Sequence, residues 1–256
     1  MKFSKRATAI VLAALTISSA SFIGMTMNEA AISSYAATTY SKSYYNNKAN
    51  EIVKKNSFKK AQPGMKLYKV AATQVGNTWN NSTLYSGTSS PISYSGSFVN
   101  WCINKAGLRN YYKNSKYKTG YFASPADGGQ AIDSRYMRIM KASKYYNGND
   151  LSIIECIKKA PCSNINAAKY NYKVGDIIYL GYHNRNNGYL YSNVGIVSAV
   201  NTYAGVKYVS YIYGDAGDDG RVANSTIKLD ESVNYGNTVI LAVATSTPVP
   251  YDYNEM

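Results

Sequence analysis

Apolar residues recur at helical spacing in two segments in the first half of the chain. One segment covers residues 67–76 and the other runs from about Ser95 to Lys105, and Gly76 and Gly107 follow as helix stops. A third, shorter helix is predicted around Leu151–Lys159. The apolar positions that indicate these helices are Leu67, Val70, Ala71, Val75, Phe98, Val99, Cys102, Ile103, Ala106, Leu151, Ile154 and Ile157.

The second half of the chain contains short apolar runs that predict strands. Segments 174–180, 194–200, 206–212 and 239–244 are rich in Val, Ile, Tyr or Ala, and residues 181–193 between the first two read as a loop of Asn, Gly and Tyr. Because helices come first and strands follow, the pattern favours an α+β domain over alternating βαβ units. We therefore expect N-terminal helices packed on an antiparallel sheet.

The first residues have the layout of a secretory signal peptide. A basic start precedes an apolar run, and a small-residue cleavage pattern ends at Ala36. The run is short for a membrane span, so cleavage is favoured over an uncleaved anchor, and no stable span is expected afterwards. The chain then divides into a signal peptide over 1–36, a polar linker over 37–62 with room for one frayed helix, a folded domain over 63–248 and a tail over 249–256.

Positive charge points to a polyanionic partner. The chain has 28 Lys and Arg against 14 Asp and Glu, and removing residues 1–36 takes away three basic and one acidic residue, which leaves +12. An exported cationic protein is attracted to an anionic cell envelope. Nucleic acid is disfavoured, since the basic residues lack the clustering of a binding arm; the alternative is a charge that only aids solubility. The densest basic group is Lys54, Lys55, Lys59 and Lys60.

The supply of cysteine and histidine limits the chemistry. The only histidine is His183, which excludes sites that need two imidazoles. Of the three cysteines, Cys102 lies among apolar helix positions, and Cys156 and Cys162 are close enough to pair, although spacing alone does not establish a disulfide. Residues 215–220 carry carboxylates in a Gly-rich stretch, but a tight turn explains them as well as calcium does. No metal and no cofactor is predicted.

Several sequence segments, taken together, resemble one enzyme family. Residues 94–107 read Tyr-Ser-Gly-Ser-Phe-Val-Asn-Trp-Cys-Ile-Asn-Lys-Ala-Gly, residues 174–179 read Val-Gly-Asp-Ile-Ile-Tyr, and residues 193–197 read Asn-Val-Gly-Ile-Val. In this order, after a first helix near residues 70–77, they resemble the CHAP family, which contains cysteine- and histidine-dependent amidohydrolases and peptidases. The resemblance covers roughly residues 65–248 and implies a papain-like α+β fold.

The sequence departs from the family at its catalytic positions. Ser95 stands where the family has its nucleophilic cysteine, Asn193 stands where it has its histidine, and Asp215 lies in the region that orients that histidine. A serine hydroxyl needs a general base during attack, and Asn cannot accept a proton near neutral pH. The resemblance therefore implies lost catalysis, with Tyr94, Ser95, Asn193 and Tyr213 left as ligand-binding positions.

Local alternatives exist for these residues. Ser95 could serve as an ordinary helix N-cap, accepting hydrogen bonds from the backbone N–H groups two or three residues on. His183 could act as a substitute base if its loop folded back toward Ser95, but an exposed loop histidine is favoured. Cys102 is expected to be an inert core residue, because a buried thiol has a raised pKa.

The sequence thus predicts a secreted, CHAP-like pseudoenzyme that binds peptidoglycan or another anionic cell-wall polymer. Family members commonly cleave amide bonds in peptidoglycan, and the resemblance implies that the binding cleft is retained. The many tyrosines, 27 in all, suit contact with polar polymers. Two alternatives stand beside this prediction: an active peptidoglycan amidase or endopeptidase with a rewired Ser95 site, and a secreted interaction protein that uses the fold as a platform.

Overall fold

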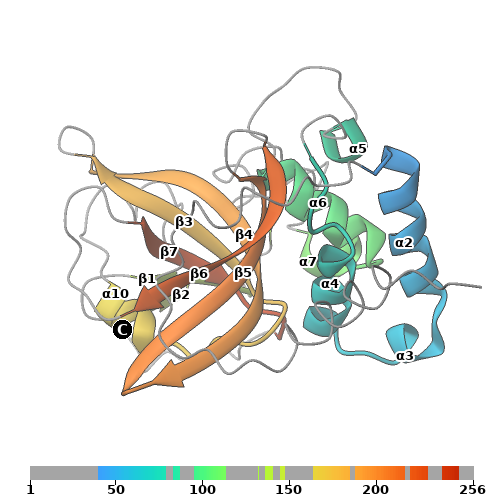
Figure 1. The fold of residues 1–256 in the computed structure, drawn as a ribbon. Coiled ribbons are helices and arrows are strands. Elements are labelled where there is room, and N and C mark those ends of the chain that lie inside the picture. Colours follow the sequence, from blue (N-terminus) through green and yellow to red (C-terminus); the bar gives the residue numbers. More distant parts are fainter. Residues whose placement is uncertain are drawn as a thin grey trace, which may run out of the picture. The chain divides into compact units, whose positions relative to one another are not determined.

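The computed structural model describes residues 40–78, 83–86, 95–113, 132, 136–140, 145–147, 164–184, 188–216, 220–229 and 238–247, which belong to one compact unit (Figure 1). Its helices are α2 (Lys42–Lys54), α3 (Asn56–Lys59), α4 (Pro63–Ala72), α5 (Thr83–Ser86), α6 (Ser95–Lys105), α7 (Arg109–Tyr112) and α10 (Asn164–Lys169). Its strands are β1 (Met137–Met140), β2 (Tyr145–Asn147), β3 (Ile177–Asn184), β4 (Gly188–Tyr203), β5 (Val206–Ala216), β6 (Arg221–Leu229) and β7 (Thr238–Ala244).

The strands form one seven-stranded sheet in the order β2-β1-β7-β3-β4-β5-β6, and all neighbours are antiparallel. Helix α6 packs against β4 and β5, α4 packs against β4 and α6, and α10 packs against β6 and β7 (Figure 1). The α+β prediction is therefore confirmed.

The two faces of the sheet bury different apolar clusters, because side chains alternate along each strand. In β3, Ile177 and Tyr179 belong to the cluster that contains α6, whereas Ile178 and Leu180 belong to the cluster that contains Ala167 of α10. We call these the α6-side core and the α10-side core.

The turn that leads into β3 accounts for the Gly and Asp residues of the segment Val174-Gly-Asp. Gly175 has a φ of +90°, in the left-handed region that favours glycine. The fully buried Asp176 carboxylate accepts hydrogen bonds from the backbone N–H of Lys173 and of Ser246, both at 2.9 Å. Burial raises the pKa of Asp176, and those hydrogen bonds partly offset the rise. The strand consequently begins at Ile177, three residues later than predicted.

Residues 37–62 were expected to form a polar linker with one frayed helix, but from residue 40 to residue 62 the chain is largely helical and packed. Helix α2 begins after the N-cap Ser41, whose side chain accepts from the backbone N–H of Tyr44, and it buries Tyr45 and Ala49. Helix α2 packs against α3 and α4. Only two of its 13 residues are buried, which is why its sequence lacks a clear apolar stripe.

Two further predictions differ from the structure. Helix α4 ends at Ala72, so Val75 lies beyond it and is 42% exposed. The predicted loop 181–193 is mostly a β-hairpin, in which β3 continues to Asn184 and β4 begins at Gly188. The predicted helix Leu151–Lys159 lies outside the described residues.

Candidate functional site

Helix α6 begins at Ser95, the residue at the nucleophile position of the resemblance. Apolar side chains at helical spacing, including Phe98 and Val99, bury this helix in the α6-side core. Ser95 itself is 0% exposed, and among the described residues nothing hydrogen-bonds to its Oγ. The N-cap interpretation of Ser95 is therefore wrong: the residue is the first of the helix, and its hydroxyl accepts no capping bond.

A buried polar network that the sequence did not suggest fixes the surroundings of α6. Tyr85 of α5 places its ring edge-on to Phe98 and Trp101, with centroids 5.3 and 5.4 Å apart. Its hydroxyl donates to Gln74 Oε1 at 3.1 Å and accepts from Asn77 Nδ2 at 2.5 Å. The sequence signal for this network was the pair of amide residues after α4, Gln74 and Asn77, because a buried amide needs hydrogen-bond partners.

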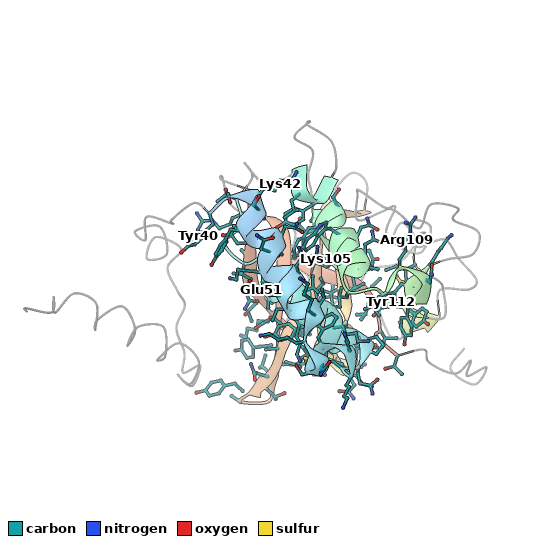
Figure 2. The ribbon with its side chains drawn as sticks, turned by 90° about the vertical axis from the view of Figure 1, so that its right-hand side faces the viewer. Tyr40, Lys42, Glu51, Lys105, Arg109 and Tyr112 are labelled. Atoms are coloured by element: carbon teal, nitrogen blue, oxygen red, sulfur yellow. The ribbon has the colours of Figure 1, made fainter. Side chains whose placement is uncertain are left out.

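The same network reaches the N-terminal helix. Gln74 Nε2 donates to the backbone oxygen of Tyr45 at 3.0 Å and to Thr73 Oγ1 at 2.7 Å. On the outside, Lys105 of α6 reaches toward α2, where its Nζ donates to Asn46 Oδ1 at 2.9 Å (Figure 2). Helix α2 is thus attached to the part of the chain that holds α6.

Cys102 behaves as the sequence predicts. It is fully buried, is a free cysteine, and belongs to the α6-side core. Burial raises the pKa of its thiol well above the ordinary value, which suppresses the reactive thiolate. Cys102 is therefore a core residue, and it offers no substitute nucleophile. Cys156 and Cys162 lie outside the described residues.

The sheet register places Asn193 on the face of the α10-side core. Asn193 pairs with Leu180, which belongs to that core, and direct cross-strand partners share a face. The next residue, Val194, belongs to the α6-side core, as alternation requires. Asn193 is half-buried. The structure therefore does not bring Asn193 and Ser95 into one hydrogen-bonded pair.

Tyr213 lies on the same face as Asn193. It pairs with Gly195, two residues along β4 from Asn193, and packs against the α10-side core. A Cβ on Gly195 would lie 2.8 Å from Tyr211 Cδ2 and 3.3 Å from Tyr213 Cβ, so glycine makes room for these two rings. Asn193 and Tyr213 are thus the two predicted ligand-binding residues that the structure groups together.

The remaining predicted residues contribute less to the site. Tyr94 lies outside the described residues, and only the backbone of Asp215 is described, in β5. The backbone of His183 lies in β3 opposite Tyr189, near the tip of the hairpin, so His183 is not in a loop. Its side chain is not described.

The arrangement offers no nucleophile–base pair within the described part of the chain. Among the described side chains none hydrogen-bonds to the buried hydroxyl of Ser95, and the carboxylate of the buried Asp176 accepts from two backbone N–H groups that hold a turn. The described residues also contain no group of three or more His, Cys, Asp or Glu side chains that could hold a metal ion. No helix in the described ranges is long and apolar enough to span a membrane.

Neither known family models, nor curated proteins, nor solved structures give a significant match to this chain.

Proposed function

We propose that the chain is a secreted CHAP-like domain that has lost catalysis and holds peptidoglycan or another cell-envelope polymer without cutting it. The observation that carries this proposal is the start of α6. There the Ser95 hydroxyl is 0% exposed and lacks a hydrogen-bond partner among the described residues. A serine hydrolase needs a base within hydrogen-bond reach of its nucleophile and a path for the substrate.

The order of the elements supports the CHAP-like part of the proposal. Helix α6 precedes β3, β4 and β5 in the chain and packs against β4 and β5. The segments 174–179 and 193–197, which resemble consecutive family motifs, meet in the sheet, because Ile177 pairs with Ile196. A papain-like arrangement of one N-terminal helix against antiparallel strands is compatible with this topology.

The position of Asn193 supports the loss of catalysis. An amide can donate and accept hydrogen bonds but does not take up a proton near neutral pH. Its pairing with Leu180 also places it on the face opposite α6. General-base catalysis is commonly worth about 10²–10⁴-fold in rate, so its loss leaves little useful turnover.

The cell-envelope partner rests on the signal-peptide layout of the first residues and on the net charge of +12 that remains without residues 1–36. Asn193 and Tyr213, which share one half-buried face of β4 and β5, are the polar residues that we assign to the polymer. Tyrosine offers a polymer both an apolar ring and a hydrogen-bonding hydroxyl.

Sedimentation with purified peptidoglycan tests the binding part. We expect the chain lacking residues 1–36 to co-sediment at moderate salt, and the Asn193→Ala and Tyr213→Ala variants to be retained less. Ser95→Ala is the matched control and should be retained like the wild type, since Ser95 has no exposed surface. If the wild type stayed in the supernatant, the binding claim would be lost.

A further inference from the structure

A groove lies between α2, α3 and α4, and none of the described residues that line it belongs to α6 or to the sheet. Its volume is about 430 Å³, within the range of small-ligand sites. Lys48 and Ile52 line it from α2, Phe58 from α3, and Tyr68 and Lys69 from α4, with Lys55 at the junction of α2 and α3. Direct packing of the three helices on one another forms its walls.

The groove lies in the most cationic part of the chain. Residues 40–78 contain eight lysines and one acidic residue, Glu51, so they carry seven of the fourteen net positive charges. Glu51, labelled on α2 in Figure 2, is exposed and does not line the groove. Lys48 and Lys55 are seven residues apart, close to two helical turns or about 10 Å. Positive charge therefore extends along the groove instead of meeting at one point.

The floor of the groove is apolar and recessed. Ile52 and Tyr68 are half-buried, and Phe58 is only 5% exposed. A strand-like molecule can enter and place an uncharged spacer on this floor while its anionic groups meet the lysines. A flat bilayer cannot reach a recessed floor, because membrane-surface binding needs protruding apolar side chains.

We propose that this groove binds a phosphodiester polymer whose spacers are polyols or sugars. Lysine binds phosphate as a point charge, whereas arginine is preferred where a carboxylate or a phosphate is held by two parallel bonds, so a lysine-only groove suits anions that are held by charge and not by a fixed bidentate geometry. Residues 40–78 contain lysine and no arginine. Repeated anions at intervals match charge spread over about 10 Å better than a single carboxylate does. This inference does not rest on the site at α6.

Single-stranded nucleic acid shares the phosphodiester chemistry but requires aromatic faces on which bases stack. The groove contains the half-buried ring of Tyr68 and the buried ring of Phe58. The exposed Tyr44 nearby stacks on Tyr40 at a centroid distance of 4.1 Å, and Lys48 Nζ lies 5.2 Å from the Tyr44 ring centroid. Tyr40 and Tyr44 are thus already stacked on each other, and the burial of Phe58 and Tyr68 leaves little ring face for a base, so a spacer without bases is favoured.

Binding of a synthetic poly(glycerol phosphate) oligomer to the full chain tests the proposal. The groove variant combines Lys48→Gln, Lys55→Gln and Lys69→Gln, and the matched control combines Lys59→Gln, Lys60→Gln and Lys66→Gln, which remove the same charge outside the groove lining. We expect the groove variant to lose about tenfold or more in affinity and the control no more than about threefold. The wild-type affinity should fall with salt with a log–log slope of roughly −2, corresponding to three neutralised phosphates.

Tyr68→Ala gives a second, charge-neutral test. It should weaken binding while leaving the salt slope unchanged, because it alters the floor and no charge. If the two lysine variants lost affinity equally, or if neither lost affinity, the groove would not be the binding site. Tighter binding of single-stranded DNA of the same length, or of vesicles containing phosphatidylglycerol, would overturn the assigned occupant.

Discussion

The backbones of Gly64 and Gly175 touch, and neither position has room for a side chain. A Cβ on Gly175 would overlap the carbonyl group of Gly64, and a Cβ on Gly64 would lie 2.6 Å from Ser246 Oγ. This contact joins the first turn of α4 to the turn that enters β3. Gly175 lies in a segment that resembles a family motif. Packing therefore explains why a glycine stands at this position, independently of catalysis.

Gly175→Ala should destabilise the domain strongly. The substitution places a Cβ at a positive φ and drives it into the backbone of α4, so we expect a loss of roughly 3 kcal/mol or more in the free energy of unfolding. Gly107→Ala is the matched control, because Gly107 has a φ of +73° with nothing within 4 Å of the added Cβ. It should cost only about 1–2 kcal/mol. Denaturant unfolding of both variants measures the difference, and equal losses would contradict the proposed contact.

The buried tyrosines should make the domain unfold at alkaline pH. Burial raises the pKa of Tyr211 to about 12 and also raises the pKa values of Tyr112, Tyr172 and Tyr179 well above the ordinary value of a tyrosine. A phenol with a folded pKa above its unfolded value near 10 contributes stability that is complete below that value and is lost as pH rises through the folded pKa. Tyrosinate absorbance and circular dichroism should therefore change together in a final cooperative step.

Tyr112→Phe tests this alkaline transition at one residue. The Tyr112 hydroxyl is buried without a hydrogen-bond partner among the described residues, so its removal should shift the alkaline midpoint upward without loss of stability at neutral pH. Gradual ionisation of every tyrosine near pH 10, with unchanged circular dichroism, would show that these rings are accessible.

Cys102 should resist thiol reagents in the native protein. In a Cys156→Ser, Cys162→Ser background it is the only thiol, and its complete burial and raised pKa leave almost no accessible thiolate. Labelling should become stoichiometric only in denaturant. Rapid labelling of the native chain would mean that α6 does not pack as described.

The double variant Ser95→Cys, Asn193→His should remain inactive on peptidoglycan. Sequence resemblance alone suggests that it could restore some thiol-dependent hydrolysis, but the register places residue 193 on the sheet face away from α6. The imidazole introduced at position 193 would then lie out of reach of a thiolate at position 95. Release of peptides by this variant, blocked by a thiol reagent, would show that the two positions share a site.

The sequence predicted some elements well and missed others for identifiable reasons. The bounds of α6 were predicted correctly, because apolar spacing marks its buried face and Gly107 takes the left-handed conformation that ends a helix. The hairpin of β3 and β4 was missed, because its Asn, Gly and Tyr residues resemble a loop in composition. Helix α2 was expected only as one frayed helix within a polar linker, because few of its residues are buried and its sequence has no clear apolar stripe.

The site was less predictable than the fold. The face on which Asn193 lies depends on pairing with Leu180, and a register is not visible in a single strand. The burial of the Ser95 hydroxyl likewise depends on packing between segments far apart in the chain. The density of lysines around residue 55 was visible in the sequence. The groove itself was not, because it forms only where three helices meet.

The central claim is that this chain binds a cell-envelope polymer and does not cleave the bonds of that polymer. Mass spectrometry of the soluble fraction, after the chain lacking residues 1–36 has been incubated with peptidoglycan, tests it most directly when retention is measured in the same sample. We predict that the protein is found on the polymer and that no peptides beyond a protein-free control are released. Release of muropeptide fragments by the wild type that disappears in Ser95→Ala would contradict the account.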